Sequence, residues 1–219
     1  MLQQDLIPAE PGHIGTDESG KGDYFGPLVV AGFFCPEGQE EVLRELGVRD
    51  SKGIGDNRCR EIAETLRRGY MHAVVAIGPA RYNELYEKFR NLNKLLAWGH
   101  ARVIENILER VDCRKAVTDQ FGDERYVRNA LLTRGKTISL VQRTKAESDP
   151  AVAAASILAR AEFLKRLHFD GLDWGIEFPK GASAAVDAAA VEFVRRHGRE
   201  ALAKVAKLHF KTTIKALGS

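Results

Sequence analysis

Short runs of β-branched and aromatic residues near the start of the chain predict the strands of a sheet. Residues 13–18 form one such run and end in two acids, and residues 27–35 form a second run after a glycine-rich turn, so the two predict a hairpin. Residues 72–77 have the composition of a third, buried strand. Two shorter strands are predicted further along, at residues 116–118 and 137–142.

Helical periodicity predicts most of the remaining structure. The pair Asp56-Asn57 is a start signal for the first helix, and Pro150 lies in the first turn of an alanine-rich one. In chain order, the predicted helices are residues 57–68, 80–89, 94–110, 150–167, 184–196 and 199–208. Three strands, then helices, then alternating strands and helices predict an α/β fold with a mixed sheet whose antiparallel part comes first.

The composition is that of a globular protein. Of the 219 residues, 44% are hydrophobic and 29% are charged, and no repeat or low-complexity linker divides the chain. We therefore expect residues 1–219 to form a single domain, with a core over about 12–180 and a helical C-terminal extension over about 181–219. The sequence shows no signal peptide and no apolar run long enough for a membrane span, and its three cysteines are scattered. These features predict a cytoplasmic protein that does not contact a membrane.

Basic residues are concentrated near the end of the chain. The formal net charge is only +3, but residues 193–219 contain one acid, Glu200, and seven lysines and arginines. These are Arg195, Arg196, Arg199, Lys204, Lys207, Lys211 and Lys215. A segment of this kind suits a polyanion such as a nucleic acid, and the alternative is a basic, solvated helical surface.

Four acids lie at the ends of separate predicted elements: Asp17, Glu18, Asp119 and Glu147. They can converge on one point only if a positive charge neutralises them, and divalent cations with oxygen ligands do this. The alternative is that Glu147, Ser148 or Asp149 caps the following helix and that the other acids belong to turns. The sequence of residues 15–22 also nearly matches a phosphate-binding loop, but Gly22 stands where such a loop requires Ser or Thr.

A resemblance to a known family rests on motifs that follow one another from about residue 12 to the C-terminus. They are GTDESGKGDYFGPLVVAG at 15–32, DSK at 50–52, YN at 82–83, NLN at 91–93, LAWGH at 96–100, TDQF at 118–121, KAE at 145–147, AVAAASILAR at 151–160, FPKG at 178–181 and KLHF at 207–210. Together they resemble the type 2 ribonucleases H. DYFGPL and a Glu at the fourth acidic position are typical of ribonuclease HIII, whereas ribonuclease HII usually has Asp there.

The resemblance implies a ribonuclease H-like α/β fold with a mixed five-stranded sheet, its first three strands antiparallel, flanked by helices. It also implies that Asp17, Glu18, Asp119 and Glu147 are catalytic residues and metal ligands. The implied activity is hydrolysis of the RNA strand of RNA/DNA hybrids, which leaves 5′-phosphate and 3′-hydroxyl ends. Two Mg²⁺ or Mn²⁺ ions would take part in it, and Asp17 is the best candidate to bridge them. We expect a monomer. Ribonucleases HIII typically carry an N-terminal domain resembling the TATA-binding protein, and only about a dozen residues precede the first motif here.

Substrate recognition requires a group that senses the ribose 2′-hydroxyl. The loop formed by Gly20, Lys21 and Gly22 is the candidate, because its glycines permit close backbone approach and Lys21 can neutralise a phosphate. Further candidates for backbone contacts are Ser51, Lys52, Asn91, Asn93, Lys145 and Lys180. For Ser156, His100 and His209 the sequence leaves a structural role and a role in the site equally open, and Trp98 and Trp174 are expected to pack in the core.

Three other functions remain as alternatives. A module that binds hybrids without cutting them would be expected to lack one of the carboxylates, and all four are present. A DNA integrase or junction resolvase would use similar acids but would not be expected to carry the Gly20–Gly22 loop or the alanine-rich helix. Ribonuclease HII activity on single ribonucleotides embedded in DNA is disfavoured by Glu147 and DYFGPL, through the resemblance alone.

Overall fold

One mixed sheet forms the centre of the molecule. The computed structural model describes residues 11–49 and 51–218, apart from the side chain of Lys52. Its five strands lie in the order β3-β2-β1-β4-β5, with β1 antiparallel to β2, β2 antiparallel to β3, and β1, β4 and β5 parallel. The strands are β1 (Gly12–Ser19), β2 (Leu28–Pro36), β3 (His72–Ile77), β4 (Lys115–Asp119) and β5 (Ser139–Arg143). The prediction of a mixed sheet with its antiparallel part first is confirmed.

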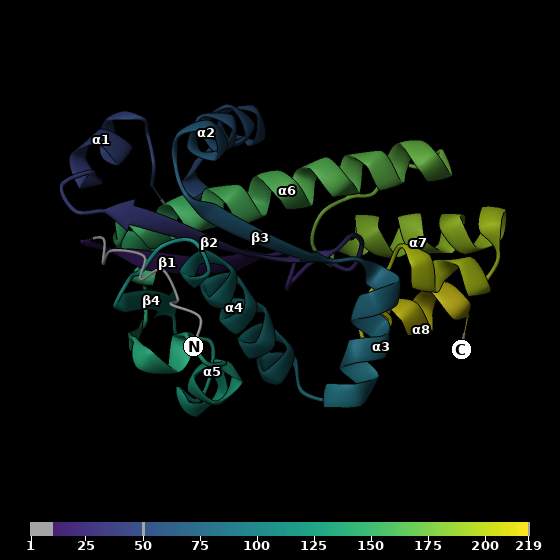
Figure 1. Ribbon diagram of the computed structural model, residues 1–219. Helices are drawn as coiled ribbons and strands as arrows, with labels where there is room; N and C mark the ends of the chain where they lie inside the picture. Colours follow the sequence, from purple (N-terminus) through teal and green to yellow (C-terminus); the bar gives the residue numbers. More distant parts are fainter. Residues whose placement is uncertain (1–10, 50, 219) are drawn as a thin grey trace.

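Helices cover both faces of this sheet (Figure 1). The long α6 packs across β1 and β2, with α1 and α2 on the same side, while α4 and α5 lie on the opposite face. The helices are α1 (Glu40–Glu45), α2 (Asp56–Gly69), α3 (Pro79–Phe89), α4 (Leu92–Leu108), α5 (Arg125–Ala130), α6 (Pro150–Trp174), α7 (Ala184–His197) and α8 (Lys211–Leu217). Because its stretch from Ala151 to Ala155 is almost all alanine, α6 presents small side chains to the sheet and is fully buried there.

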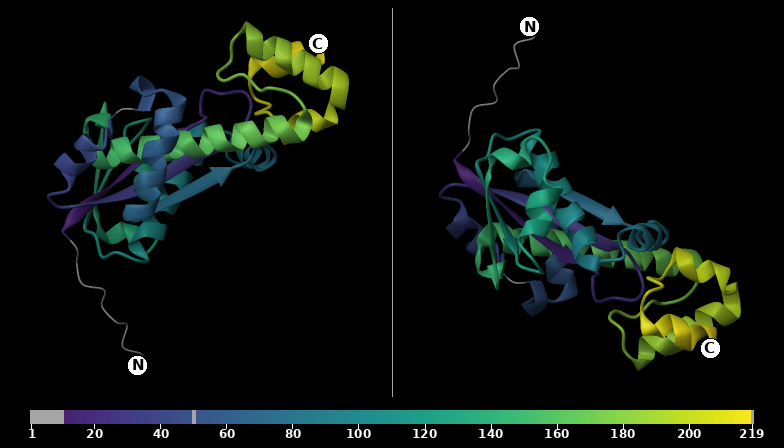
Figure 2. Two further views of the ribbon diagram at one scale, coloured as in Figure 1. Left: turned by 90° about the horizontal axis from the view of Figure 1, so that it is seen from above. Right: turned by 90° about the horizontal axis from the view of Figure 1, so that it is seen from below.

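The C-terminal helices α7 and α8 pack together at one end of α6, beyond the sheet (Figure 2). Aromatic side chains join this part to the rest of the core. Phe193 of α7 contacts Phe178, and Phe178 in turn contacts Phe25, which follows β1, with ring centroids 5.8 and 4.5 Å apart. One continuous hydrophobic cluster therefore runs from the sheet into the C-terminal helices.

Two predictions about helices are wrong. The helix expected over residues 199–208 is a short 3-10 helix, η4 (Glu200–Lys204), because residues 205–207 leave it to run beside residues 24–26. The start signal at Asp56 is not a side-chain cap: the N-cap of α2 is Gly55, and Asp56 instead binds Arg160 and Lys180. The alanine-rich helix also continues past residue 167 to Trp174.

The three cysteines are all free and buried, and both tryptophans lie partly buried against hydrophobic clusters. Among the described residues, none of the helices combines the length and the apolar character needed to cross a membrane.

Candidate active site

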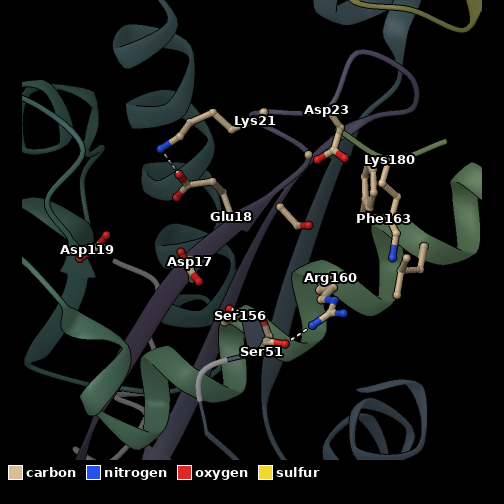
Figure 3. Close-up of a pocket in the computed structure, with 14 residues that line it drawn as sticks. Asp17, Glu18, Lys21, Asp23, Ser51, Asp119, Ser156, Arg160, Phe163 and Lys180 are labelled. Carbon is tan, nitrogen blue, oxygen red and sulfur yellow. Dashed lines mark hydrogen bonds and ion pairs between the residues drawn. The ribbon is translucent and has the colours of Figure 1, made fainter. Parts of the chain in front are cut away.

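A pocket opens where β1 ends, and three of the four predicted carboxylates line it (Figure 3). Its lining consists of Asp17, Glu18, Ser19, Gly20, Lys21, Gly22, Asp23, Ser51, Asp119, Ser156, Arg160, Phe163, Leu164 and Lys180. Parallel pairing explains why the acids meet, since Thr16 of β1 lies beside Thr118 of β4 and the next residues are Asp17 and Asp119. Carboxyl ends of parallel neighbours lie at the same edge of a sheet.

Glu18 is held from two sides. Its side chain is only 9% exposed, and its two oxygens accept hydrogen bonds from Lys21 Nζ at 2.7 Å and from His100 Nε2 at 3.2 Å. His100 is fully buried, and its Nδ1 lies 2.8 Å from Thr16 Oγ1 and 3.3 Å from Thr118 Oγ1. Burial opposes the charge of Glu18, but the His100 and Lys21 contacts outweigh it and lower the pKa of Glu18 to about 2. Glu18 is therefore ionised and fixed in orientation.

Asp17 has a different environment. Burial, followed by the negative charge of Glu18, raises the pKa of Asp17 to about 7, and the Ser156 hydroxyl only partly offsets this effect. Ser156 also shares a 2.7 Å hydrogen bond with Ser51 on the wall of the pocket. Glu18 already pairs with Lys21 and His100, whereas Asp17 forms no ion pair with a cation among the described side chains. Its oxygen donors fit a hard divalent cation, which would supply the missing positive charge.

Glu147 lies near this pocket but does not line it. It is half-buried in the 3-10 helix η3 (Ala146–Ser148), whose first amide, Ala146 N, donates to Asp119 Oδ1 at 3.2 Å. Within residues 11–49 and 51–218, no three His, Cys, Asp or Glu side chains stand close enough together to form a complete metal site. The structure thus brings Asp17, Glu18 and Asp119 together at one pocket. Glu147 directly follows Ala146, whose amide contacts Asp119.

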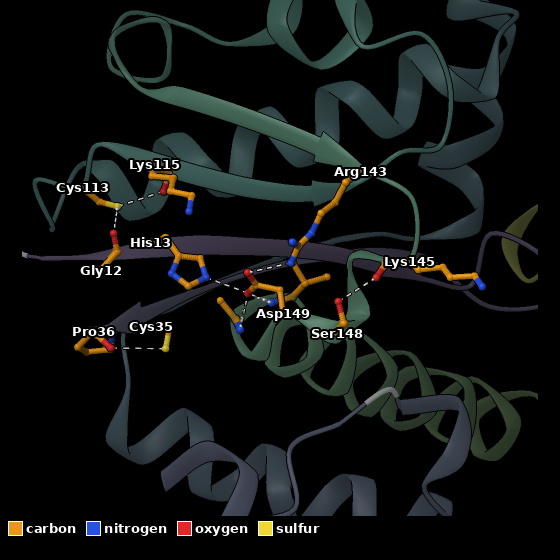
Figure 4. Close-up of polar contacts among 12 residues, drawn as sticks. Gly12, His13, Cys35, Pro36, Cys113, Lys115, Arg143, Lys145, Ser148 and Asp149 are labelled. Atoms are coloured by element: carbon orange, nitrogen blue, oxygen red, sulfur yellow. Dashed lines mark hydrogen bonds and ion pairs between the residues drawn. The ribbon is translucent and has the colours of Figure 1, made fainter. Parts of the chain in front are cut away.

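Asp149, rather than Glu147, caps the helix that follows. Its Oδ1 accepts from Ala151 N at 2.9 Å and Val152 N at 3.4 Å, and it is 2.8 Å from His13 Nε2 on β1 (Figure 4). Burial opposes the charge of Asp149, but the contact with His13 and the helix amides outweigh it, so the pKa of Asp149 is lowered. Asp149 therefore has the capping role that was considered for Glu147, and the Glu147 carboxylate does not cap α6.

The loop after β1 forms one rim of the pocket. Gly20 has φ +89°, and a Cβ there would lie 2.2 Å from the Pro27 carbonyl oxygen, so the position requires glycine. Asp23 N donates to Gly20 O at 3.3 Å, which places Lys21 and Gly22 at the tip of a turn. A Cβ on Gly22 would meet nothing within 4 Å. Within the described residues, the amides of Lys21 and Gly22 have no acceptor and are open to a ligand.

The opposite rim carries two cations held by Asp56 at the start of α2. Asp56 accepts from Arg160 Nη2 at 2.6 Å and from Lys180 Nζ at 2.7 Å. Arg160 also donates to the Ser51 carbonyl oxygen. Burial opposes the Asp56 charge, but Lys180 and Arg160 together outweigh it and lower the pKa of Asp56. Of the predicted contact residues on this side, Ser51 and Lys180 line the pocket.

The remaining predicted contact residues lie elsewhere or have other partners. Asn91 is the N-cap of α4, where its side chain accepts from Asn93 N at 2.9 Å and Lys94 N at 3.3 Å. Neither Asn91 nor Asn93 lines the pocket, and Lys145 is an exposed residue in a left-handed conformation before η3. Lys52 belongs to the 3-10 helix η1 (Ser51–Gly53), but its side chain is outside what the structure describes, and Asp50 of the same motif lies outside the described residues.

Sequence reasoning missed several pocket residues. Arg160, Phe163 and Leu164 follow Ser156 on α6 at helical spacings of four, seven and eight positions, so a single face of this helix supplies all four. That periodicity was the available signal, because Ser156 was already a candidate. Asp23 gave no such signal, since its role depends on a hydrogen bond from Gly181 N at 2.7 Å.

Comparison with known proteins places the chain among nucleases. The family model described as ribonuclease HII matches residues 14–213. The ribonuclease HIII of Protochlamydia amoebophila (strain UWE25) is 45% identical over 214 residues, a match that covers 98% of this chain and 70% of that protein.

Solved structures give the same picture. The crystal structure of Bst-RNase HIII in complex with Mn²⁺ superimposes with a TM-score of 0.88 at 34% identity, covering 96% of this chain and 70% of that one. The crystal structure of Aquifex aeolicus RNase H3 gives a TM-score of 0.75 at 33% identity, covering 90% and 72%. The expected ribonuclease H-like fold is confirmed by these matches.

Proposed function

The chain belongs to the family of ribonucleases HII and HIII, and on this premise we propose that it is an endonuclease that cuts the RNA strand of RNA/DNA hybrids, leaving 5′-phosphate and 3′-hydroxyl ends. The observation that carries the proposal is the pocket itself. Asp17, Glu18 and Asp119 line it together, and the turn formed by Gly20, Lys21 and Gly22 borders it with free amides. Acids of the kind that hydrolysis requires and amides of the kind that bind a nucleic-acid backbone therefore border one pocket, which supports the proposal.

Divalent cations, Mg²⁺ or Mn²⁺ and two per site, are part of this proposal. Asp17 and Glu18 would hold them, with Asp119 and Glu147 completing the ligand set. Burial and the negative charge of Glu18 both disfavour an ionised Asp17, so a cation bound there would offset both effects, and the related Bst-RNase HIII was crystallised with Mn²⁺. When bound, such ions activate the attacking water and stabilise the leaving oxygen at a phosphodiester.

The protein's own residues orient these groups and the substrate. His100 fixes the direction of the Glu18 carboxylate through its 3.2 Å hydrogen bond. Lys21, whose side chain is 44% exposed, pairs with Glu18 and is close enough to the opening to turn toward a phosphate. The amides of Lys21 and Gly22 would donate to a ribose hydroxyl or a phosphate oxygen. On the opposite rim, Arg160 and Lys180 would contact the strand further along.

Activity of the ribonuclease HIII type is favoured over activity of the HII type. Glu147 stands at the fourth acidic position, and the compared relative at 45% identity is named ribonuclease HIII. We also propose that the enzyme acts as a monomer and that it works in the cytoplasm, and the three free, buried cysteines support the second of these proposals.

The test is the variant Asp119→Asn on a uniform RNA/DNA hybrid in Mg²⁺ or Mn²⁺. We expect cleavage to fall by at least about a thousandfold while the circular dichroism spectrum is unchanged, because an amide is a poorer ligand for a hard cation than a carboxylate. Asp123→Asn is the matched control, since Asp123 is an exposed acid four residues after Asp119, in the segment that follows β4, and pairs with Arg125. Turnover like wild type in Asp119→Asn would contradict the assignment.

A further inference from the structure

Lys207 is fully buried, with 0% of its surface exposed to solvent. Its Nζ donates to the carbonyl oxygens of Gly26 at 2.7 Å and Asp23 at 2.8 Å, and a third, that of Phe25, lies 3.5 Å away. Its Nζ is also 5.7 Å from the ring centre of Tyr82. Burial lowers the pKa of Lys207 to about 7, so keeping the ammonium here costs free energy that an apolar side chain would not. The carbonyl contacts offset that cost, and they indicate that the lysine holds the main chain of residues 23–26.

The main chain around Lys207 grips the same segment. Lys207 N donates to Tyr24 O at 2.9 Å, and Gly26 N donates to Val205 O at 3.0 Å. Residues 205–207 thus run beside residues 24–26 in the manner of a short antiparallel pair. Lys207 adds its side-chain contacts to this pairing, so that residues 23–26 are held by both the main chain and the side chain of the C-terminal segment.

A second clamp acts at Asp23 itself. Tyr24 N donates to Gly181 O at 2.9 Å, and Gly181 N donates to Asp23 Oδ1 at 2.7 Å. Asp23 is also the last residue of the turn that carries Lys21 and Gly22, since its amide closes that turn on Gly20. The position of the turn over the carboxylate pocket therefore depends on how firmly residues 23–26 are held.

We propose that Lys207 is a positioning residue for substrate binding, which holds the Gly20–Gly22 turn over the pocket so that its free amides meet the hybrid in one fixed arrangement. The inference rests on the proposed function for the identity of the ligand. The C-terminal segment then contributes to hybrid affinity chiefly through the shape of this turn.

The charges of the C-terminal segment fit this interpretation. Arg195 and Arg196 both pair with Glu192, and Lys215 pairs with Asp187. Three of the seven basic residues in this segment are thus paired with acids, and Lys207 is buried. The segment offers far less free positive charge than its sequence indicates, which weakens the alternative that it binds the hybrid by charge alone.

The test compares Lys207→Met with Lys204→Met, an identical change at an exposed lysine on the same segment. We expect Lys207→Met to raise KM for a uniform hybrid, and to weaken hybrid binding in EDTA measured by fluorescence anisotropy, by about tenfold or more, because small misplacements of binding groups cost affinity steeply. We expect kcat to change by less than about threefold and Lys204→Met to behave as wild type. Equal effects of the two variants, or wild-type KM and affinity in Lys207→Met, would overturn the proposal.

Hydrogen exchange supplies a readout independent of catalysis. The amides of residues 21–26 are expected to exchange faster in Lys207→Met than in wild type, while β1 and α6 remain protected. If Lys207→Met does not fold, Lys207→Gln, which keeps two N–H donors, is expected to show the same faster exchange and a smaller rise in KM. Unchanged exchange in the variant that folds would overturn the proposal. If the wild-type protein neither binds nor cuts a hybrid, the proposed function fails, and the exchange rates still decide whether Lys207 holds the turn.

Discussion

His100 and Glu18 form a partly buried hydrogen bond, 3.2 Å between Nε2 and Oε2, at a carboxylate that lines the pocket. An ionised carboxylate only accepts, so Nε2 carries a proton and donates it to Glu18, while Nδ1 lies 2.8 Å from the Thr16 hydroxyl. This relationship ties α4 to the ends of β1 and β4. It fixes one of the four catalytic candidates before any cation or substrate arrives.

Replacing His100 by Phe tests this bond. The phenyl ring keeps the shape of the site and the packing against Phe121, whose ring centre lies 5.0 Å away. It removes the donor to Glu18 and the ring nitrogen that hydrogen-bonds to Thr16, so we expect the protein to fold with about 1–3 kcal/mol less stability and to lose about 10- to 100-fold in kcat/KM. His72→Phe, on β3 away from the pocket, is the control for the chemical change. Undiminished kcat/KM in His100→Phe would contradict the orienting role.

Asp17 makes the stability of the metal-free protein depend on pH. Its pKa rises from 3.8 to about 7 on folding, chiefly through burial, so the folded state holds a proton that the unfolded state has lost in this range. Stability therefore falls as pH rises from about 4 to about 7 and stays low above it. We expect Asp17→Asn in EDTA to be more stable than wild type by about 4 kcal/mol at pH 8, with the difference vanishing near pH 4.

Urea unfolding of both proteins at pH 5 and pH 8 measures this difference. Mg²⁺ or Mn²⁺ is expected to raise the melting temperature of wild type but not that of Asp17→Asn, because the variant lacks the buried charge that a cation would neutralise. A variant less stable than wild type at pH 8 would show that the charge is already balanced within the protein.

Gly20 and Gly22 are predicted to respond differently to the same substitution. Gly20→Ala forces a Cβ against the Pro27 carbonyl at a positive φ, so we expect a loss of stability of about 1–3 kcal/mol. Gly22→Ala meets open space and is expected to leave the melting temperature within about 2 °C of wild type. If the substrate backbone approaches this turn closely, Gly22→Ala should still raise KM several-fold. Wild-type KM in a folded Gly22→Ala protein would remove the turn from substrate recognition.

Asp149 is predicted to stabilise the fold without taking part in cleavage. It caps α6 and pairs with His13, so Asp149→Ala is expected to cost about 1–3 kcal/mol, measured by urea unfolding. The neighbouring Glu147→Ala should leave stability nearly unchanged and abolish most of the activity, because Glu147 has no capping role. The reverse pattern would exchange the roles proposed for these two acids.

Much of the fold follows from local patterns. β3 matches the predicted residues 72–77, and the alternation of apolar runs with glycine-rich turns located the β1–β2 hairpin. These features depend on neighbouring residues, which a sequence displays directly. The end of the chain could not be predicted this way, because residues 205–207 are not helical and instead pair with residues 24–26, which are far away in the sequence.

The candidate site shows the same division. Asp17, Glu18 and Asp119 could be proposed because they end strands, and parallel pairing then brings them together. The role of Asp56 could not, since a residue typical of a helix start is used instead to hold Arg160 and Lys180. The burial of Lys207 was hidden for a related reason: among six other basic residues, nothing local marks the one that turns inward.

The most direct test of the central claim is cleavage of two end-labelled duplexes by the wild-type protein, in Mg²⁺ and separately in Mn²⁺. One is an RNA strand paired with DNA, and the other is a DNA strand that contains a single ribonucleotide, paired with DNA. The carboxylate pocket predicts rapid cutting of the first duplex and none in EDTA, and Glu147 together with the relative named ribonuclease HIII predicts little cutting of the second. Preferential cutting of the second duplex would contradict the ribonuclease HIII assignment, and tight binding without cutting of either would contradict the claim that this pocket is catalytic.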